Sequence, residues 1–166
     1  MEREQLQALQ APLKQRYRDD AEAALVTLSA SGGLGEGISC SVDTGRAAAA
    51  AGLHPASGGD GTLLCSGDML LEALVACAGV TLRAVATSLE IPVSGRVHAE
   101  GDLDFRGTLG VDREAPVGFA AIRLSFELET DADDEQLATL QRLTERYCVV
   151  YQTLAAAPLI ETTFSR

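Results

Sequence analysis

The sequence predicts an α+β fold in which an antiparallel sheet packs against two central helices. Residues 93–105 and 122–129 alternate apolar and polar side chains with a period of two, which is typical of half-buried strands. Residues 66–89 form an apolar helical pattern, and a second helical pattern begins in the acidic run 131–135. The expected order is helix, strands, long helix, strands, helix, strand, which is an α+β arrangement.

We expect residues 1–23 to form a helical extension that precedes a domain over 24–166. The extension belongs to a helical pattern over 3–25, which Pro12 is expected to kink or break. The apolar residues of this pattern recur at helical spacing, namely Leu6, Leu9, Leu13 and Tyr17.

A strand pair is expected next, with a strand over 24–30, a glycine-rich turn over 32–37 and a returning strand over 38–42. The alanine run 47–51 is ambiguous between helix and strand. The glycine and proline content of 52–61 predicts a loop.

The central helix is expected over Ser66–Leu89. Ser66 is the expected N-cap, and Asp68 in the first turn suits the helix dipole. One apolar stripe is expected to consist of Leu70, Leu74, Cys77, Thr81 and Val85.

The C-terminal half is expected to hold the two alternating strands, a turn region over 106–116 and a final strand over 159–164. The turn region has room for a short strand of its own. The helix between the strands and the tail should carry four residues on one face, Leu137, Leu140, Thr144 and Tyr147.

Charge and hydropathy narrow the function classes. The 166 residues include 13 basic and 24 acidic side chains, for a formal charge of −11. This balance argues against nucleic-acid and anionic-membrane partners. The apolar stretch 69–86 is interrupted by Glu72 and Arg83, and the first residues form no apolar signal core, so we expect no membrane span and a cytoplasmic protein. In the cytoplasm, the four cysteines are expected to be reduced thiols.

Three features of the sequence resemble the OsmC/Ohr family, the osmotically inducible protein C and organic hydroperoxide resistance proteins. The first is the run Asp68-Met-Leu-Leu-Glu-Ala-Leu-Val-Ala-Cys77 in the central helix. The second is the pair of alternating strands. The third is Tyr147-Cys148-Val-Val, about seventy residues after the first cysteine. The resemblance covers about Ala24 to Phe164.

The resemblance implies an intertwined homodimer with two active sites at the subunit interface. It implies that Cys77 attacks an organic hydroperoxide or hydrogen peroxide as a thiolate and becomes a sulfenic acid. Cys148 would condense with it to a disulfide, and a dithiol reductant would restore the pair. The loop over 52–65 would form part of the pocket wall.

The chemistry needs a thiolate, because a free thiol with a pKa of about 8.5 is mostly protonated at neutral pH. Members of the family use an arginine held by a glutamate at the start of the central helix. This sequence has Gly67 at the usual glutamate position, with Asp68 next to it, and no arginine between Arg46 and Asp68. His54 and Asp68 are therefore the candidate activating groups for Cys77.

Other interpretations start from the same residues. A family member that lost peroxide turnover would serve as a module that binds an apolar small molecule or a protein partner. Cys40 and Cys65 are expected to be structural. We expect no cofactor and no metal, since the cysteines and histidines show no ligand spacing. A serine hydrolase is not supported, since there is no Gly-x-Ser-x-Gly motif.

Overall fold

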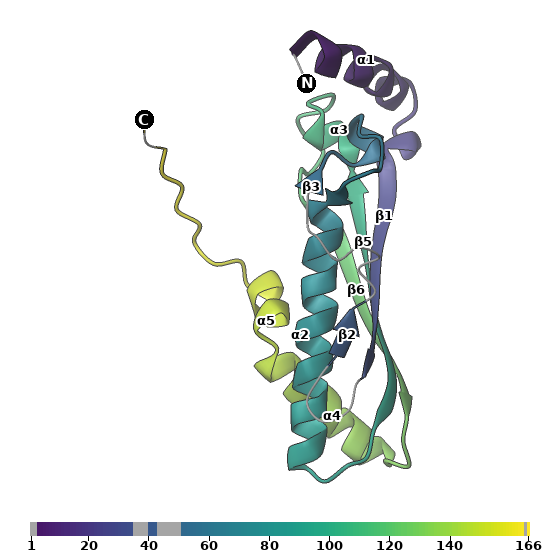
Figure 1. The fold of residues 1–166 in the computed structure, drawn as a ribbon, viewed down its shortest axis with the longest axis vertical. Coiled ribbons are helices and arrows are strands. Elements are labelled where there is room, and N and C mark those ends of the chain that lie inside the picture. The colour runs from purple at the N-terminus through teal and green to yellow at the C-terminus, as the bar shows by residue number, and fades with distance from the viewer. Residues whose placement is uncertain (1–2, 35–39, 43–50, 165) are drawn as a thin grey trace.

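The fold is a long antiparallel sheet with one long helix lying along it (Figure 1). The structure is a computed structural model that describes residues 3–34, 40–42, 51–164 and 166. Within these ranges the side chains of residues 3–7, 9, 28–32, 34, 40–42 and 51 lie outside the description. The described part confirms the expected α+β class.

The main sheet has four strands in the order β2-β1-β5-β6, and each neighbouring pair is antiparallel. Its strands are β1 (Leu25–Leu34), β2 (Cys40–Val42), β5 (Ser94–Asp104) and β6 (Phe119–Glu129). A small second sheet pairs β3 (Ala51–Gly52) with β4 (Leu64–Cys65) in parallel.

In the described part of the chain the helices are α1 (Arg3–Asp19), α2 (Ser66–Ser88), α3 (Phe105–Thr108), α4 (Asp134–Tyr147) and α5 (Val149–Ala155). Two short 3-10 helices, η1 (Glu22–Ala24) and η2 (Pro55–Ser57), lie in the connections. Figure 1 shows α4 and α5 beside the lower half of α2 and α1 at the opposite end of the molecule. Helices α4 and α5, which meet at Cys148, are therefore remote from the N-terminal helix.

Period-two alternation explains the two faces of the sheet. Val97 and Ala99 of β5 point inward and are fully buried. On the outer face, Arg123 of β6 donates to Asp102 at 2.6 and 2.9 Å and to Glu100 at 3.2 Å. An exposed ion-pair group of this kind adds little stability. The sheet is therefore held mainly by the apolar face that α2 covers.

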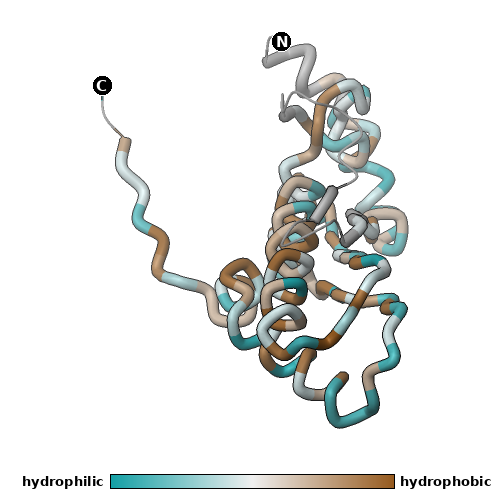
Figure 2. The backbone as a smooth tube through the Cα atoms, turned by 60° about the horizontal axis from the view of Figure 1, so that its bottom comes forward, coloured by the Kyte–Doolittle hydropathy of each residue, from teal (hydrophilic) through white to brown (hydrophobic). Residues whose placement is uncertain are grey.

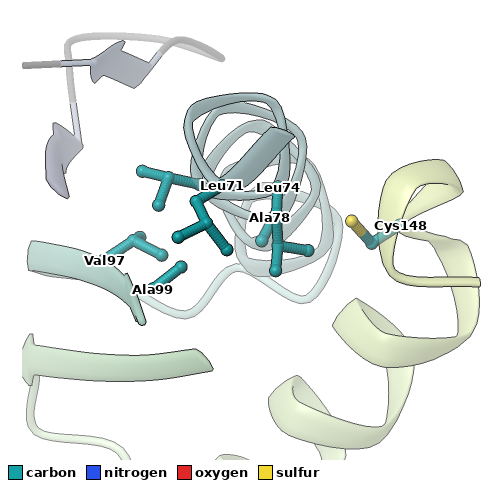
Figure 3. Close-up of a cluster of buried hydrophobic side chains, with 7 residues drawn as sticks. Leu71, Leu74, Ala78, Val97, Ala99 and Cys148 are labelled. Atoms are coloured by element: carbon teal, nitrogen blue, oxygen red, sulfur yellow. The ribbon is translucent and has the colours of Figure 1, made fainter. Parts of the chain in front are cut away.

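The core lies between α2 and the sheet. Leu71, Leu74, Val75 and Ala78 of α2 are buried together with two β5 residues and Cys148 (Figure 3). Among the described residues, α2 is the one helix long and apolar enough to cross a membrane by length and composition alone. Here its buried side packs on the sheet.

The buried stripe of α2 differs from the expected one. Leu74 and Val85 are buried as expected, whereas Leu70 is exposed and Cys77 and Thr81 are only half-buried. The N-cap of the helix is Cys65 and not the expected Ser66, so it lies one residue earlier in the chain. Cys77 and Thr81 thus border the core on a flank that another element can approach.

Several expected elements differ near the ends of the chain. Of the kink or break expected at Pro12, the break is wrong, because helix α1 continues through this residue, and the kink stays a prediction. The helix ends at Asp19 instead of 25. The turn region after β5 holds the helix α3 and no strand. Strand β1 extends to Leu34, so the first residues of the turn expected over 32–37 belong to the strand. The rest of this turn and residues 47–50 of the alanine run 47–51 lie outside the described residues, and Ala51 belongs to β3.

The largest difference between the expected and the observed fold lies at the C-terminus. Residues 159–164 form no strand, and a short helix, α5, precedes them. Figure 1 shows the tail running away from the sheet of its own chain, where no strand can pair with it. Tyr147, expected on the apolar face of α4, is exposed.

The N-terminal helix is attached to the loop after β3. Tyr17 is buried beside Phe105 and Leu109, its hydroxyl donates to the Ala56 carbonyl, and Gln10 donates to the Ser57 carbonyl. The boundary between an extension over 1–23 and a domain over 24–166 stays a prediction.

We expect Asp133→Ala to lower the free energy of unfolding by about 1 kcal/mol, because it removes the N-cap of α4. The Asp133 carboxylate accepts from the Gln136 backbone N–H at 2.8 Å, and the Gln136 side chain accepts from the Asp133 N–H at 3.0 Å. Urea denaturation measures the loss. Asp133→Ser is the control and should retain most of the stability; equal losses in both variants would contradict the capping role.

Candidate active site

Cys148 lies at the junction between α4 and α5. Its backbone N–H donates to the Thr144 carbonyl at 2.9 Å, which completes the last turn of α4. Its Sγ accepts from the Tyr151 N–H at 3.4 Å, so the same residue is the N-cap of α5. The side chain is fully buried and points toward α2 (Figure 3). Two helix ends therefore hold this sulfur in place.

Cys77 lies in the middle of α2, half-buried, and faces the start of α5. Hydrogen bonding by the Val150 and Val149 backbone, by the Cys148 side chain and by the Thr81 hydroxyl one turn further along α2 lowers the pKa of its thiol. The fold thus brings together two cysteines that are 71 residues apart, as the resemblance implied.

The two thiols differ in acidity. Burial by itself raises the pKa of Cys77, but hydrogen bonds from Val150, Cys148, Val149 and Thr81 outweigh it and bring the pKa below its ordinary value. Burial raises the pKa of Cys148 to about 11, and the neighbouring Cys77 sulfur adds to the increase. In this pair Cys77 is the acceptor and ionises first, while Cys148 remains the thiol that donates to it.

The hydrogen bonds explain how a thiolate can form in the middle of a helix. Cys77 is remote from the positive end of its own helix, whose dipole acts only on the first turn. The start of α5 instead presents two backbone N–H groups that have no partner within α5. Among the described residues, no histidine or arginine contributes to the Cys77 pKa shift. The expected cation beside Cys77 is not found in the described part of the chain.

His54 and Asp68 form a separate pair near the start of α2. The His54 Nδ1 accepts from the Ala56 N–H at 3.0 Å, and the ring stacks on Phe105 at a centroid distance of 5.1 Å. Burial lowers the pKa of His54 and raises that of Asp68, while each charge partly opposes the shift of the other. Asp68 precedes Cys77 by nine residues, about 13 Å along the helix axis at 1.5 Å per residue.

The structure therefore divides the four expected site residues into two pairs. Within one chain, His54 and Asp68 are too remote to hydrogen-bond the Cys77 sulfur. Sequence reasoning missed the contributions of Val149, Val150 and Thr81. The i, i+4 spacing of Cys77 and Thr81 could have indicated the hydroxyl. The backbone donors depend on α5, which the sequence did not predict.

An open groove of about 740 Å³ adjoins Cys148. We call it the β6–α4 groove. Strand β6 contributes Ile122, Leu124 and Phe126, the helices contribute Leu74, Leu140, Thr144, Cys148 and Leu154, and eleven further residues complete its lining. No residue of the loop 52–65 lines it, so the loop does not form the wall of this groove.

The remaining cysteines have no part in the pair. Cys65 is a free thiol at the N-cap of α2, packed against the edge of the core. The side chain of Cys40 lies outside the described part. Within the described residues, no group of three or more histidine, cysteine, aspartate or glutamate side chains is arranged to hold a metal ion.

Comparisons with known proteins agree on one family. A family profile described as OsmC-like protein matches residues 59–163. Among solved structures, the chain is similar to the crystal structure of an OsmC-like hydroperoxide resistance protein from Jannaschia sp. CCS1, with a TM-score of 0.59 and 15% identity. The match covers 86% of this chain and 95% of that one, so the two share a fold. No curated protein matches the chain.

Proposed function

The chain belongs to the OsmC-like protein family, and from this premise we propose that it is a thiol-dependent peroxidase that reduces organic hydroperoxides. The observation that carries the proposal is the unequal pair of sulfurs. Cys77 has a lowered pKa and Cys148 a raised one, and they are in hydrogen-bond contact. One sulfur is thus prepared to attack, and the other stays protonated beside it. The role of such an enzyme is defence against oxidative stress.

In the proposed reaction the Cys77 thiolate attacks one peroxide oxygen and breaks the O–O bond. The organic fragment leaves as an alkoxide and takes up a proton to become an alcohol, while Cys77 becomes a sulfenic acid. The Cys148 sulfur then attacks the Cys77 sulfur, and a disulfide forms with loss of water. A dithiol reductant returns both cysteines to thiols and is itself oxidised to a disulfide.

The contacts support each residue's role. The N–H groups of Val149 and Val150 and the Thr81 hydroxyl stabilise the attacking thiolate. Cys148 needs little movement to react, because it lies close enough to Cys77 for each thiol to shift the pKa of the other. Hydrogen peroxide would follow the same route. We assign His54 and Asp68 no direct role at Cys77 within one chain.

We also propose that the protein works as a homodimer in the cytoplasm, where dithiol reductants are available. Support for a partner copy comes from the C-terminal tail, in which Leu159, Ile160 and Phe164 are 87%, 80% and 94% exposed. Figure 2 shows this apolar stretch projecting from the body. Tyr147 and Val149, beside the cysteine pair, are also exposed, which is consistent with a site at a subunit interface.

The test is a reaction of the reduced protein with one equivalent of cumene hydroperoxide. The proposal expects one equivalent of 2-phenyl-2-propanol, and a protein whose mass is lower by two hydrogen atoms. Proteolytic mapping should find the new disulfide between Cys77 and Cys148. Loss of peroxide without thiol loss, or a disulfide elsewhere, would refute the proposed mechanism.

A second function is a family member without turnover, which binds an apolar small molecule. The observations that favour it are Gly67 at the usual glutamate position and the lack of a cation beside Cys77 among the described residues. This function predicts that the reduced protein and cumene hydroperoxide coexist without alcohol formation.

A further inference from the structure

Helix α5 is a short and weakly anchored element that packs against the core around Cys148. It has seven residues, all of them described by the structure, and each is half-buried or exposed. A helix of this length is not stable by itself. Val150, Tyr151 and Leu154 pack against the core cluster that contains Cys148 and that Cys77 borders. The stability of α5 therefore depends on this packing and on the contacts of its first turn.

The first turn of α5 is capped by sulfur instead of the usual oxygen. The Tyr151 backbone N–H donates to the Cys148 sulfur at 3.4 Å, and Cys148 is the N-cap residue. Sulfur is a weaker acceptor than the hydroxyl, amide or carboxylate oxygen that caps most helices. Figure 3 shows the same sulfur pointing toward α2, the helix that carries Cys77. A redox-active atom therefore holds the start of this helix.

The Cys77 thiolate is a second support for the first turn of α5. Burial opposes ionisation of Cys77, but hydrogen bonding by the Val150 and Val149 backbone contributes to a pKa below the ordinary value. Linkage makes this effect reciprocal, so ionised Cys77 stabilises folded α5 by the same free energy. An anion beside the N–H groups of a helix N-terminus is favourable for the same reason. In the reduced state, sulfur therefore serves the first three residues of α5.

A disulfide between Cys77 and Cys148 weakens both supports. In net terms, two thiols lose two hydrogen atoms to the oxidant, and one S–S bond replaces two S–H bonds. The disulfide is neutral, so the N–H groups of Val149 and Val150 lose the anion. Its S–S bond of about 2 Å also fixes the Cys148 sulfur against α2, so this sulfur is no longer free to follow the Tyr151 N–H.

We propose that α5 is a redox-controlled lid on the cysteine pair, which is closed over the reduced pair and opened by formation of the Cys77–Cys148 disulfide. The use of this opening rests on the proposed peroxidase function. Cys148 is fully buried, so an external dithiol cannot reach its sulfur while α5 is folded. Tyr151, Leu154 and Ala155 line the β6–α4 groove together with Cys148, so unfolding of α5 widens the approach to the disulfide.

Hydrogen–deuterium exchange of the full chain measures the opening of α5. One sample is kept reduced with dithiothreitol. The other is oxidised with diamide, which takes up the two hydrogen atoms of the thiols and becomes a hydrazine, so no peroxide is needed. Peptide mapping confirms the Cys77–Cys148 disulfide. We expect the amides of 150–156 to exchange about 3- to 30-fold faster after oxidation, the range for loss of an N-cap. The amides of 136–143 in α4 are the internal reference and should not change.

Gln152 gives a test that leaves both sulfurs in place. Its side chain donates to the Glu145 carbonyl at 2.7 Å and so ties α5 to the end of α4. Gln152→Ala should increase exchange of α5 and speed reduction of the disulfide by dithiothreitol about 2- to 10-fold, the range of one net hydrogen bond. Gln141→Ala is the matched control, because Gln141 donates to the Glu145 carboxylate at 2.8 Å within α4 alone. It should leave the reduction rate unchanged.

Four results would overturn the proposal. The first is a confirmed Cys77–Cys148 disulfide that leaves exchange of α5 unchanged, and the second is faster exchange that is equal in α4 and α5. The third is a reduction rate that is the same in Gln152→Ala and Gln141→Ala, and the fourth is a diamide product that links other cysteines.

The outcome for the lid is separate from the outcome for the peroxidase. If diamide opens α5 but cumene hydroperoxide is not reduced, the peroxidase proposal fails and the redox-controlled lid stands. If cumene hydroperoxide is reduced through the disulfide but exchange of α5 does not change, the lid fails and the peroxidase stands.

Discussion

Replacing Cys77 by serine is expected to lower the rate of cumene hydroperoxide consumption with a dithiol reductant on the order of 1,000-fold or more. The reaction needs the thiolate that Val149, Val150, Thr81 and Cys148 stabilise in hydrogen-bond contact with Cys77. A serine hydroxyl at this position stays protonated and is a weak nucleophile toward peroxide. Steady-state peroxide consumption measures the effect.

Cys148→Ser is expected to separate the attack of Cys77 on the peroxide from the later formation of the disulfide. A serine hydroxyl can still donate to the Cys77 thiolate, so the first equivalent of peroxide should react at nearly the wild-type rate. The sulfenic acid then has no neighbouring thiol, so it accumulates and can be trapped with dimedone. Steady-state turnover falls to the rate at which the external dithiol reaches a half-buried sulfur.

Cys65→Ser is the matched control, because Cys65 is a free thiol that does not contact the pair in the described structure. It should retain peroxide consumption near the wild-type level. Turnover that persists in Cys77→Ser would exclude Cys77 as the attacking group. Turnover that disappears equally in Cys65→Ser would show that the loss is not specific to the Cys77–Cys148 pair.

Cys77 is expected to react with iodoacetamide at least about 10-fold faster than Cys148 at pH 8. The Cys77 pKa lies below its ordinary value and that of Cys148 is raised to about 11, so a larger fraction of Cys77 is thiolate at pH 8. The more basic Cys148 thiolate is intrinsically more nucleophilic, which offsets part of this difference. Complete burial of Cys148 slows its reaction further.

The pH dependence of the two labelling rates follows from the same pKa shifts, which are downward for Cys77 and upward for Cys148. Both rates rise with pH while the thiols are mostly protonated, and the Cys77 rate levels off at a lower pH than the Cys148 rate. The Cys148 rate continues to rise toward pH 11. Peptide mass spectrometry over a labelling time course measures both rates in one sample.

Cys77→Ser is the control for the coupling between the thiols. It removes the charge and the hydrogen bond by which Cys77 raises the Cys148 pKa, so Cys148 should be labelled faster in the variant. Equal labelling of the two cysteines in the wild type would show that the environment does not distinguish them.

Local patterns predicted most of the fold. Alternation over 93–105 and 122–129 predicted β5 and β6, because one face of each strand is buried and the other carries charge. The apolar helix with Cys77 and the acid-capped helix α4 were also readable, since side-chain periodicity and capping act over neighbouring residues. The residue pattern around both cysteines was sufficient to identify the family.

Long-range contacts decided the rest. The tail 159–164 has the apolar content of a strand, but a strand needs a partner, and its own sheet lies elsewhere. Helix α5 is too short to be predicted from periodicity, and it forms where Cys148 caps its first turn.

The sequence by itself thus determined the α+β class, the family and the two cysteines that carry the proposed chemistry. The tertiary structure decided how the thiolate is stabilised, because the donors to Cys77 are backbone groups of an element that meets α2 only after folding. It also separated His54 and Asp68 from the cysteine pair and made the Cys148 sulfur the N-cap of α5. Periodicity reports which face of an element is buried, whereas the groups that meet across that face depend on packing.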